Sequence, residues 1–415
     1  MRVVAGAVAL AALSARAPAQ QVVPVQGIAG MDTTNGCLVC HAAQRQAAAE
    51  GVHSQHGVEC VSCHGGNAAA RTLPDAHQGG FTGTLNKVQT AELCGSCHSD
   101  PNRMREYGLP TGELAQFRTS RHGQLLFGSH NTDAPTCTDC HGTHIIYPPY
   151  DARSRVYPTN IPSTCAHCHA DEKLMARYQL RTDQFDHFRG SAHGVALFQQ
   201  QNFAAPTCIS CHGAHSALPP TGSEVANVCG RCHALVDQAF SSGPHGVAAE
   251  TGKLRGCLAC HSNHSTEGVP IENIGPTCDK CHAADTRLHQ IGVDLQHSVA
   301  QASEDMQSAK RAVDQLAVAG QQVGYYQFRY QEAQTYYLQI AQAQHGLDLN
   351  KVDDLARRVR SVSISLNDAA NASQENRWEH KLILLPVWFL SLSAVVLAWL
   401  ALRSLRRMRD EQREG

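Results

Sequence analysis

The chain has 415 residues, enough for two or three domains, and a formal net charge of −2 at pH 7. This charge balance gives no electrostatic footprint for nucleic acid, so a nucleic-acid partner is excluded. Aromatic residues make up only 6% of the sequence. We therefore expect something other than side chains to fill part of the interior.

Residues 1–19 have the pattern of a secretory signal peptide. Arg2 supplies the charged start, residues 3–13 form an apolar run too short to span a membrane, and Ala-Pro-Ala at 17–19 is a small-residue cleavage site. An uncleaved N-terminal anchor is the alternative interpretation. The signal predicts that the rest of the chain is exported.

All 18 cysteines occur as CxxC pairs, and histidine follows every pair at once. CxxCH is the attachment signature of c-type haem, in which two thiols bond to the haem vinyl groups and the histidine ligates the iron. One copy would leave a zinc ribbon or a thiol redox site open, but nine copies with no cysteine left over predict nine covalently attached haems c within residues 20–297. The cysteines are Cys37, Cys40, Cys60, Cys63, Cys94, Cys97, Cys137, Cys140, Cys165, Cys168, Cys208, Cys211, Cys229, Cys232, Cys257, Cys260, Cys278 and Cys281. The iron-ligating histidines are His41, His64, His98, His141, His169, His212, His233, His261 and His282.

The nine sites are of two kinds that alternate along the chain. In first-kind sites, Gly or Ser follows CxxCH and a further histidine comes behind; these sites begin at Cys60, Cys137, Cys208 and Cys257. Second-kind sites are followed by Ala or Ser without such a histidine, and they begin at Cys37, Cys94, Cys165, Cys229 and Cys278. Gly, Pro and Thr crowd the connections, which favours short helices and turns wrapped on haem, with little or no sheet. We predict four two-haem repeats behind one leading haem.

Nine of the 16 remaining histidines recur at fixed places in this repeat and are candidates for the sixth iron ligand. Five lie in a small-residue–x–His–Gly string or at the corresponding place after the last site, and match the second-kind sites: His56, His122, His193, His245 and His297. Four follow the first-kind sites and are matched to them: His77, His144, His215 and His264. His53 could replace His56, and His289 could replace His297. This count predicts low-spin haems with two histidine ligands each.

Residues 298–378 are predicted to form a long antiparallel helical hairpin. Apolar or small residues from Leu316 to Ile340 alternate in spacing between three and four, which indicates a seam on one helix over about 298–344. Gly346 ends that helix, and Asp348 or Asn350 caps the second one. The hairpin could also support an oligomer.

Residues 382–402 contain no charge over 21 positions, long enough to cross a bilayer as one helix. Five arginines lie in the tail at 403–415, and the positive-inside rule places that tail in the cytoplasm. We therefore expect a bacterial inner-membrane protein with one C-terminal span and its haem domain in the periplasm.

The doubled CxxCH motifs and the SxHG strings resemble those of the multihaem cytochromes c of bacterial respiration, over about Cys37 to His297. The resemblance implies close-packed haems that pass electrons along the chain, without a catalytic residue. The span contains no histidine to hold a haem b, so we expect a separate membrane quinol-oxidising or b-type cytochrome subunit and a periplasmic donor or acceptor protein as partners. The alternative is a multihaem oxidoreductase similar to the hydroxylamine oxidoreductases, tetrathionate reductases or nitrite reductases. Those enzymes keep one iron open for substrate.

Overall fold

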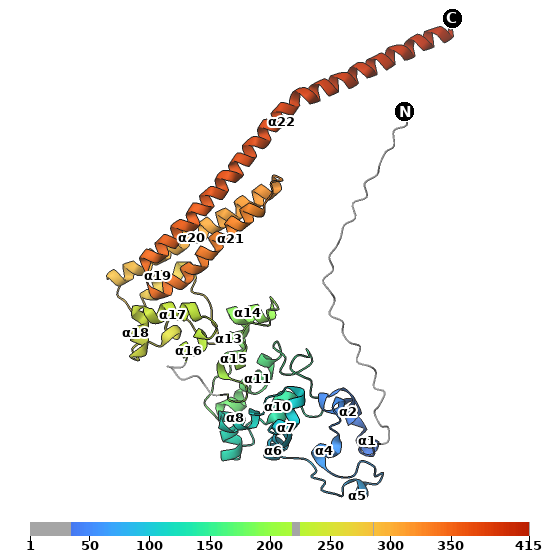
Figure 1. Ribbon diagram of the computed structural model, residues 1–415, viewed down its shortest axis with the longest axis vertical. Helices are drawn as coiled ribbons and strands as arrows, with labels where there is room; N and C mark the ends of the chain where they lie inside the picture. Colours follow the sequence, from blue (N-terminus) through green and yellow to red (C-terminus); the bar gives the residue numbers. More distant parts are fainter. Residues whose placement is uncertain (1–34, 218–224, 285, 415) are drawn as a thin grey trace. The chain divides into compact units, whose positions relative to one another are not determined.

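The computed structural model describes residues 35–217, 225–284 and 286–414, and the described residues form helices and turns without a β-strand (Figure 1). The predicted all-α class is therefore confirmed for this part of the chain. The predicted signal peptide at 1–19 lies outside it. The chain divides into two compact units. The first contains the residues up to Arg118 together with His122–Asn160, and the second contains Thr119–Arg121 together with all residues from Ile161 onward.

The first unit is built from short helices joined by turns, as the Gly- and Pro-rich connections predict. Its α-helices are α1 (Cys37–Cys40), α2 (Arg45–Glu50), α3 (Val52–Gln55), α4 (Cys60–His64), α5 (Leu73–Ala76), α6 (Lys87–His98), α7 (Pro101–Met104), α8 (Glu113–Thr119), α9 (Arg121–Gly123) and α10 (Cys137–His141). Between them lie two 3₁₀ turns, η1 (Ala42–Gln44) and η2 (Arg105–Tyr107), and one π-helical turn, η3 (Gln124–Gly128).

The second unit begins with helices of the same short kind and ends with three long ones. The short helices are α11 (Ile161–His169), α12 (Glu172–Ala176), α13 (Gln184–Gly190), α14 (Ala192–Phe198), α15 (Cys208–His212), α16 (Val225–Gly230), α17 (Ala234–Ser242), α18 (Pro244–Glu250), η4 (Gly256–Ala259), η5 (Ile271–Asn273) and α19 (Ile274–Cys278). The long helices are α20 (Arg287–Val318), α21 (Gly324–Ala343) and α22 (Leu349–Glu414), with the turn η6 (Gln344–Gly346) between the last two.

Buried apolar side chains are scarce wherever the CxxCH motifs lie. Among the described residues of the first unit, only four apolar side chains are buried: Ala91, Met104, Leu126 and Ala134. A folded region of this size ordinarily buries a continuous core of large apolar side chains. The CxxCH regions therefore need apolar surface from a source other than their own side chains.

The continuous apolar core of the described chain lies between α20, α21 and α22. Its α20 members run from Leu295 to Leu316, α21 contributes Ala333, Ile340 and Ala343, and α22 contributes Val352 to Ala370 at spacings of three and four. Leu316, Ala333 and Ile340 belong to the predicted seam, whereas the other α20 members precede it in the sequence. Each of the three helices buries one apolar stripe. We call this region the helical bundle.

The single helix predicted over 298–344 is wrong, because the chain turns at Gly320. Gly320 has a φ of +78°, which side-chain-bearing residues rarely adopt. Its N–H donates to the Ala317 carbonyl, and the Gln321 N–H donates to the Leu316 carbonyl. These two bonds form a Schellman motif, which ends α20. The region predicted to be a hairpin therefore contains three helices. The last of them is capped at its N-terminus by Asp348, whose side chain accepts a hydrogen bond from the Lys351 N–H.

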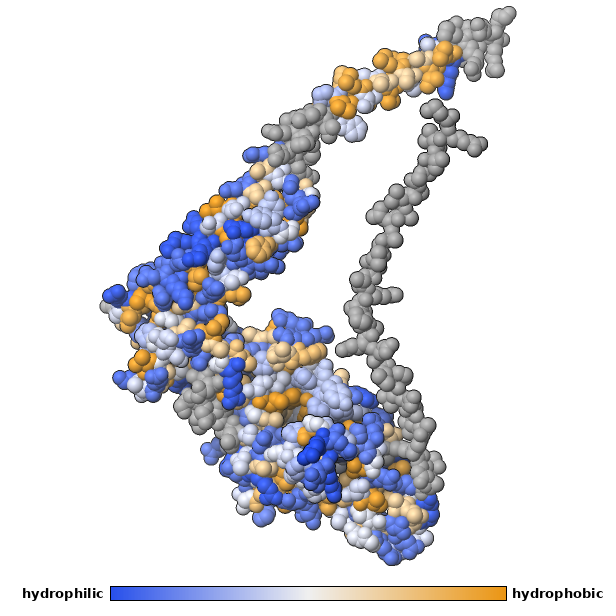
Figure 2. Space-filling view, viewed as in Figure 1, coloured by the Kyte–Doolittle hydropathy of each residue, from blue (hydrophilic) through white to orange (hydrophobic). Residues whose placement is uncertain are grey.

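The last helix runs without a break from the bundle through the apolar stretch. The predicted boundary between a hairpin ending near 378 and a separate span at 382–402 is therefore absent from α22 (Leu349–Glu414). Residues 385–407 of this helix are long and apolar enough to cross a membrane, and their side chains face outward (Figure 2). An exposed apolar surface of this extent marks a surface that contacts lipid or another protein.

Replacing Leu316 with alanine tests the bundle core. Leu316 is fully buried, so the change removes apolar contacts and leaves a cavity. We expect the free energy of unfolding of the bundle to fall by about 2–5 kcal/mol. The measurement is urea denaturation followed by far-UV circular dichroism.

Leu338→Ala is the matched control, because Leu338 lies on α21 with 65% of its surface exposed. Its free energy of unfolding should stay within about 0.5 kcal/mol of the parent value. Equal losses for the two variants would contradict the placement of the core.

Candidate cofactor-binding sites

Three of the four first-kind CxxCH sites fold as single helical turns that span the motif, namely α4, α10 and α15. In each turn the backbone N–H of the residue before the first cysteine donates to a side chain three positions on: Glu59 to Ser62, Thr136 to Asp139 and Thr207 to Ser210. Such bonds hold the start of a helix too short to stabilise itself. Each turn ends on a glycine with positive φ, namely Gly65, Gly142 and Gly213. The backbone therefore requires the glycine that follows the histidine in these motifs.

Two second-kind sites are placed differently, at the C-terminal ends of longer helices. α6 ends with Cys94–His98 and α11 ends with Cys165–His169. α6 starts at a reciprocal capping box, in which Asn86 and Gln89 each accept a hydrogen bond from the other's backbone N–H. These two sites thus differ in local structure from the three single-turn sites, whereas the second-kind site at Cys37 lies in the four-residue helix α1.

Seven of the nine CxxCH histidines face a second histidine across a gap of nearly constant width. The ring-centre distances are 6.5 Å for His41–His77, 6.0 Å for His98–His53, 6.2 Å for His64–His144, 6.2 Å for His233–His193, 6.0 Å for His212–His264, 6.2 Å for His282–His245 and 6.2 Å for His261–His345. Each pair joins one CxxCH histidine to one histidine from outside the motifs. For His141 and His169 the second ligand stays a prediction, with His122 and His215 as the repeat-placed candidates.

This spacing fits one metal ion between two imidazoles. A ligating nitrogen lies about 2 Å from the metal and the ring centre roughly 1 Å farther, so rings on opposite sides have centres roughly 6 Å apart. Rings in direct contact are closer, as for His77 and Phe81 at 4.1 Å. No group of three or more metal-ligating side chains occurs among the described residues. Two opposed imidazoles are the axial ligand set of a haem iron.

The imidazoles are held in the orientation that metal ligation requires. His64 Nδ1 lies 3.0 Å from the Gly83 carbonyl oxygen, and His261 Nδ1 lies 3.1 Å from that of Glu267. A carbonyl only accepts, so each Nδ1 is the donor and Nε2 keeps its lone pair. Hydrogen bonds of this kind fix the tautomer and ring direction of metal-binding histidines.

The partner histidines are also kept in the neutral form that binds metals. Burial lowers the pKa of six of them, and the opposing CxxCH histidine lowers it further. The six are His53, His144, His193, His245, His264 and His345. A neutral imidazole offers its lone pair to a metal without first losing a proton.

The structure places His53 opposite His98, whereas the predicted ligand His56 lies against the Tyr107 ring at 4.9 Å. His53 follows Gly51 as the second residue of α3, as His193 follows Ser191 in α14 and His245 follows Gly243 in α18. The true repeat is therefore a small cap residue, any residue, then histidine.

The glycine after the histidine has a different environment at His56 than at His193 and His245. A Cβ on Gly194 would collide with the Phe188 carbonyl, and one on Gly246 would collide with Ser241, so these glycines allow a close backbone approach. Gly57, which follows His56, has open space around it. The string at His56 matches the repeat in letters but not in packing.

His297, the ligand predicted after the last site, is not paired with another histidine ring in the described part of the chain. His297 is exposed on α20, and no CxxCH histidine faces it in the described structure. Its alternative, His289, bonds to Asp279 at 2.6 Å instead. The histidine opposite His261 is His345, which lies in η6, outside the haem repeat. No periodic signal in the sequence could have found it.

His77, which follows a first-kind site in the sequence, faces His41 of the leading second-kind site. His144 and His264 face first-kind histidines of an earlier motif, His64 and His212. His193 and His245 face second-kind histidines. The histidine that faces a CxxCH histidine therefore follows a different motif, not the same one.

The cysteines of neighbouring motifs lie against one another in a regular alternation. First cysteines are close enough for their thiols to interact in the pairs Cys37–Cys60, Cys94–Cys137, Cys165–Cys208 and Cys229–Cys257. Second cysteines are close enough to interact electrostatically in the pairs Cys63–Cys97, Cys211–Cys232 and Cys260–Cys281. The neighbouring Cys94 thiol lowers the pKa of Cys137. The contacts thus link the motifs into a run of four and a run of five, and each motif inside a run presents one cysteine to the motif before it and the other to the motif after it.

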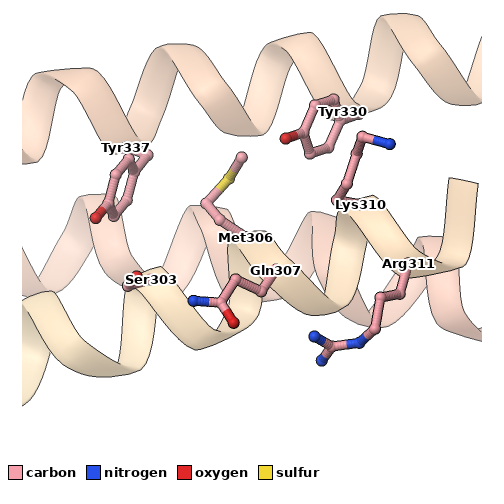
Figure 3. Close-up of a pocket in the computed structure, with 7 residues that line it drawn as sticks. All are labelled: Ser303, Met306, Gln307, Lys310, Arg311, Tyr330 and Tyr337. Atoms are coloured by element: carbon pink, nitrogen blue, oxygen red, sulfur yellow. The ribbon is translucent and has the colours of Figure 1, made fainter. Parts of the chain in front are cut away.

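A cavity of about 310 Å³ lies between α20 and α21 in the helical bundle (Figure 3). Its lining residues are Ser303, Met306, Gln307, Lys310, Arg311, Tyr330 and Tyr337. Tyr330 and Tyr337 are partly buried against the bundle core. Packing between helices accounts for these tyrosines, as their heptad spacing predicts.

No family of known proteins, no curated protein and no solved structure matches this chain.

Proposed function

We propose that this chain is a multihaem c-type cytochrome that carries electrons along nine haems and is anchored to a membrane by its last helix. One observation carries the proposal: CxxCH histidines face second histidines at 6.0–6.5 Å, seven times over. The motif supplies the covalent attachment, and the opposed ring supplies the remaining axial ligand.

The residues have three roles in this proposal. The 18 cysteines hold the porphyrins by thioether bonds, and the nine CxxCH histidines ligate iron from one side. The second histidines ligate from the other side: His53, His77, His144, His193, His245 and His264, with His122 and His215 as the predicted ligands that complete the repeat. When bound, haem supplies reversible one-electron transfer at its iron.

The alternating cysteine contacts favour a path for electrons. Each contact brings together the attachment points of two successive porphyrins, so porphyrin edges in each run would be neighbours. Within each run, the porphyrins would follow one another in the same order as their CxxCH motifs in the sequence. Electron transfer needs no more from the protein than this fixed, close spacing and a shielded iron.

The scarcity of buried side chains in the CxxCH regions supports the same proposal. Burying apolar surface is the main favourable term in folding, and the described part of the first unit buries only four apolar side chains. Porphyrin rings would provide the missing apolar surface. The haem region would then remain unfolded until haem is attached.

The paired histidines favour a carrier over an enzyme. A haem with two histidine ligands has no open position for substrate, whereas a catalytic metal site keeps one. A multihaem oxidoreductase would need one of these pairs to be broken, or the haem of His141 or His169 to lack a second histidine ligand.

The apolar stretch at 385–407 supports a membrane anchor. We infer a single span in the bacterial inner membrane, with the arginine-rich tail in the cytoplasm and the haem region in the periplasm. Because the span has no histidine, a separate quinol-oxidising or b-type subunit would exchange electrons with the haem chain. Periplasmic proteins would be the partners at its other end.

Replacing His53 with alanine tests the ligand assignment and the carrier role together. In the parent protein every iron should be six-coordinate, so the reduced form should bind no carbon monoxide. The His53→Ala variant should keep all its haems, because its cysteines are intact, and should bind one carbon monoxide per protein. Visible absorption spectra of the reduced protein measure this directly.

His56→Ala is the matched control, three residues along the chain, and should behave as the parent does. Carbon monoxide binding by the parent would identify an open iron and support the oxidoreductase. Binding by His56→Ala but not by His53→Ala would contradict the ligand assignment.

Removing the membrane stretch tests the anchor. A chain that ends at His380 keeps the haem region and the bundle but loses residues 385–407. We expect it to be released as a soluble, haem-loaded protein from the periplasm, while the full chain stays with the inner membrane. Fractionation followed by haem staining gives the answer, and a truncated protein that remains in the membrane fraction would show that another segment or partner anchors it.

A further inference from the structure

His345 lies in η6, the turn that joins α21 to α22, far along the chain from the CxxCH motifs. Its ring centre is 6.2 Å from that of His261, and the two ring planes are inclined by 22°. These values match those of the repeat-placed pairs, such as His64–His144 at 6.2 Å and 30°. The pair therefore has the same geometry although one member lies outside the repeat.

Both rings are aimed so that Nε2 is the free nitrogen. His345 Nδ1 lies 2.5 Å from the Ala341 carbonyl oxygen, one helical turn earlier, and His261 Nδ1 lies 3.1 Å from that of Glu267. Because carbonyl oxygens only accept, each Nδ1 is the donor. His345 is thus held by the end of its own helix as a ligand would be held.

The turn is also packed firmly against the CxxCH region. A Cβ on Gly243 would lie 3.0 Å from the Gly346 carbonyl oxygen, and a Cβ on Gly346 would lie 3.2 Å from that of Ala239. The two backbones therefore approach as closely as glycine permits. Gly243 also precedes α18 as its cap residue, and α18 carries His245, the partner of His282. Gly243 thus contacts the turn that carries His345 and also caps the helix that carries His245.

We propose that His345 is the sixth ligand of the haem attached at Cys257 and Cys260, so that the helical bundle closes this haem from outside the haem repeat. The inference rests on the proposed haem content. The bundle is then part of the redox chain and not only a spacer. Because α22 starts at Leu349 and continues through residues 385–407, this ligand lies next to the start of the helix that carries the anchor.

The test compares His345→Ala and His297→Ala in the full-length protein. Haem content is measured by intact mass, and carbon monoxide binding is measured on the reduced protein. His345→Ala should keep the parent's haem content and bind one carbon monoxide per protein, and added imidazole should abolish that binding. His297→Ala should bind none, because His297 is exposed on α20.

A third variant separates loss of a ligand from loss of folding. His345→Met places a weaker iron ligand at the same position, so carbon monoxide should be excluded or bind more weakly than in His345→Ala. The potential of one haem should rise, since methionine ligation raises it. A structural role for His345 alone would leave every haem's potential unchanged.

The outcomes distinguish this inference from the function on which it depends. A parent protein with fewer than nine haems contradicts the proposed function itself. A parent with nine closed haems, together with a His345→Ala variant that binds no carbon monoxide, overturns only the role of His345. Carbon monoxide binding by His297→Ala but not by His345→Ala would overturn the role of His345 and would show that His297 ligates an iron.

Discussion

Opposed pairs of imidazole rings, about 6 Å apart, are the constraint on which the rest of this structure depends. Each pair must bring a CxxCH histidine from one short helix to a histidine from another, often from a different motif. This requirement explains features that otherwise look unrelated. Glycines after CxxCH let the one-turn helices end, and glycines in the SxHG strings let backbones approach. Nδ1 bonds to carbonyls then turn the rings toward each other.

Local rules were sufficient to predict the all-α class of the described residues and most of the histidines that face a CxxCH histidine. Two local features mark these histidines in the sequence. A small helix-cap residue precedes His193 and His245, and a CxxCH motif lies directly before His144 and His264. The kind of site that each would face was correct for these four. The sequence could not show that a second ligand serves another motif, because that depends on how successive short helices turn.

The differences between the predicted and the observed arrangement have physical causes that can be named residue by residue. The sequence favours His56 over His53 because Gly57 matches the glycine of the repeat, yet a Cβ on Gly57 would meet no other atom. His345 belongs to no repeat, and the contacts of its turn with Gly243 and Ala239 place it. Gly320 carried a usable signal, since a glycine after an apolar run commonly ends a helix. The regular seam on both sides of it hid the break.

The structure also changes the view of the C-terminal region. A hairpin followed by a separate anchor would leave the membrane helix free of the haem chain. Instead α22 is continuous, packs in the bundle core through Val352 and Leu366, and starts just after His345. The apolar core of the bundle and the contact of the His345 turn with Gly243 therefore hold the start of α22 against the part of the chain that carries the last CxxCH motifs.

The central claim is that this chain folds around nine haems held by its nine CxxCH motifs. The most direct measurement is the intact mass of the mature, full-length protein under denaturing conditions, where only covalently bound groups remain. The mass should exceed that of the polypeptide by nine haems. A smaller increment in fully matured protein, or none, would contradict the account, since free thiols or bound zinc would then have to explain the same motifs.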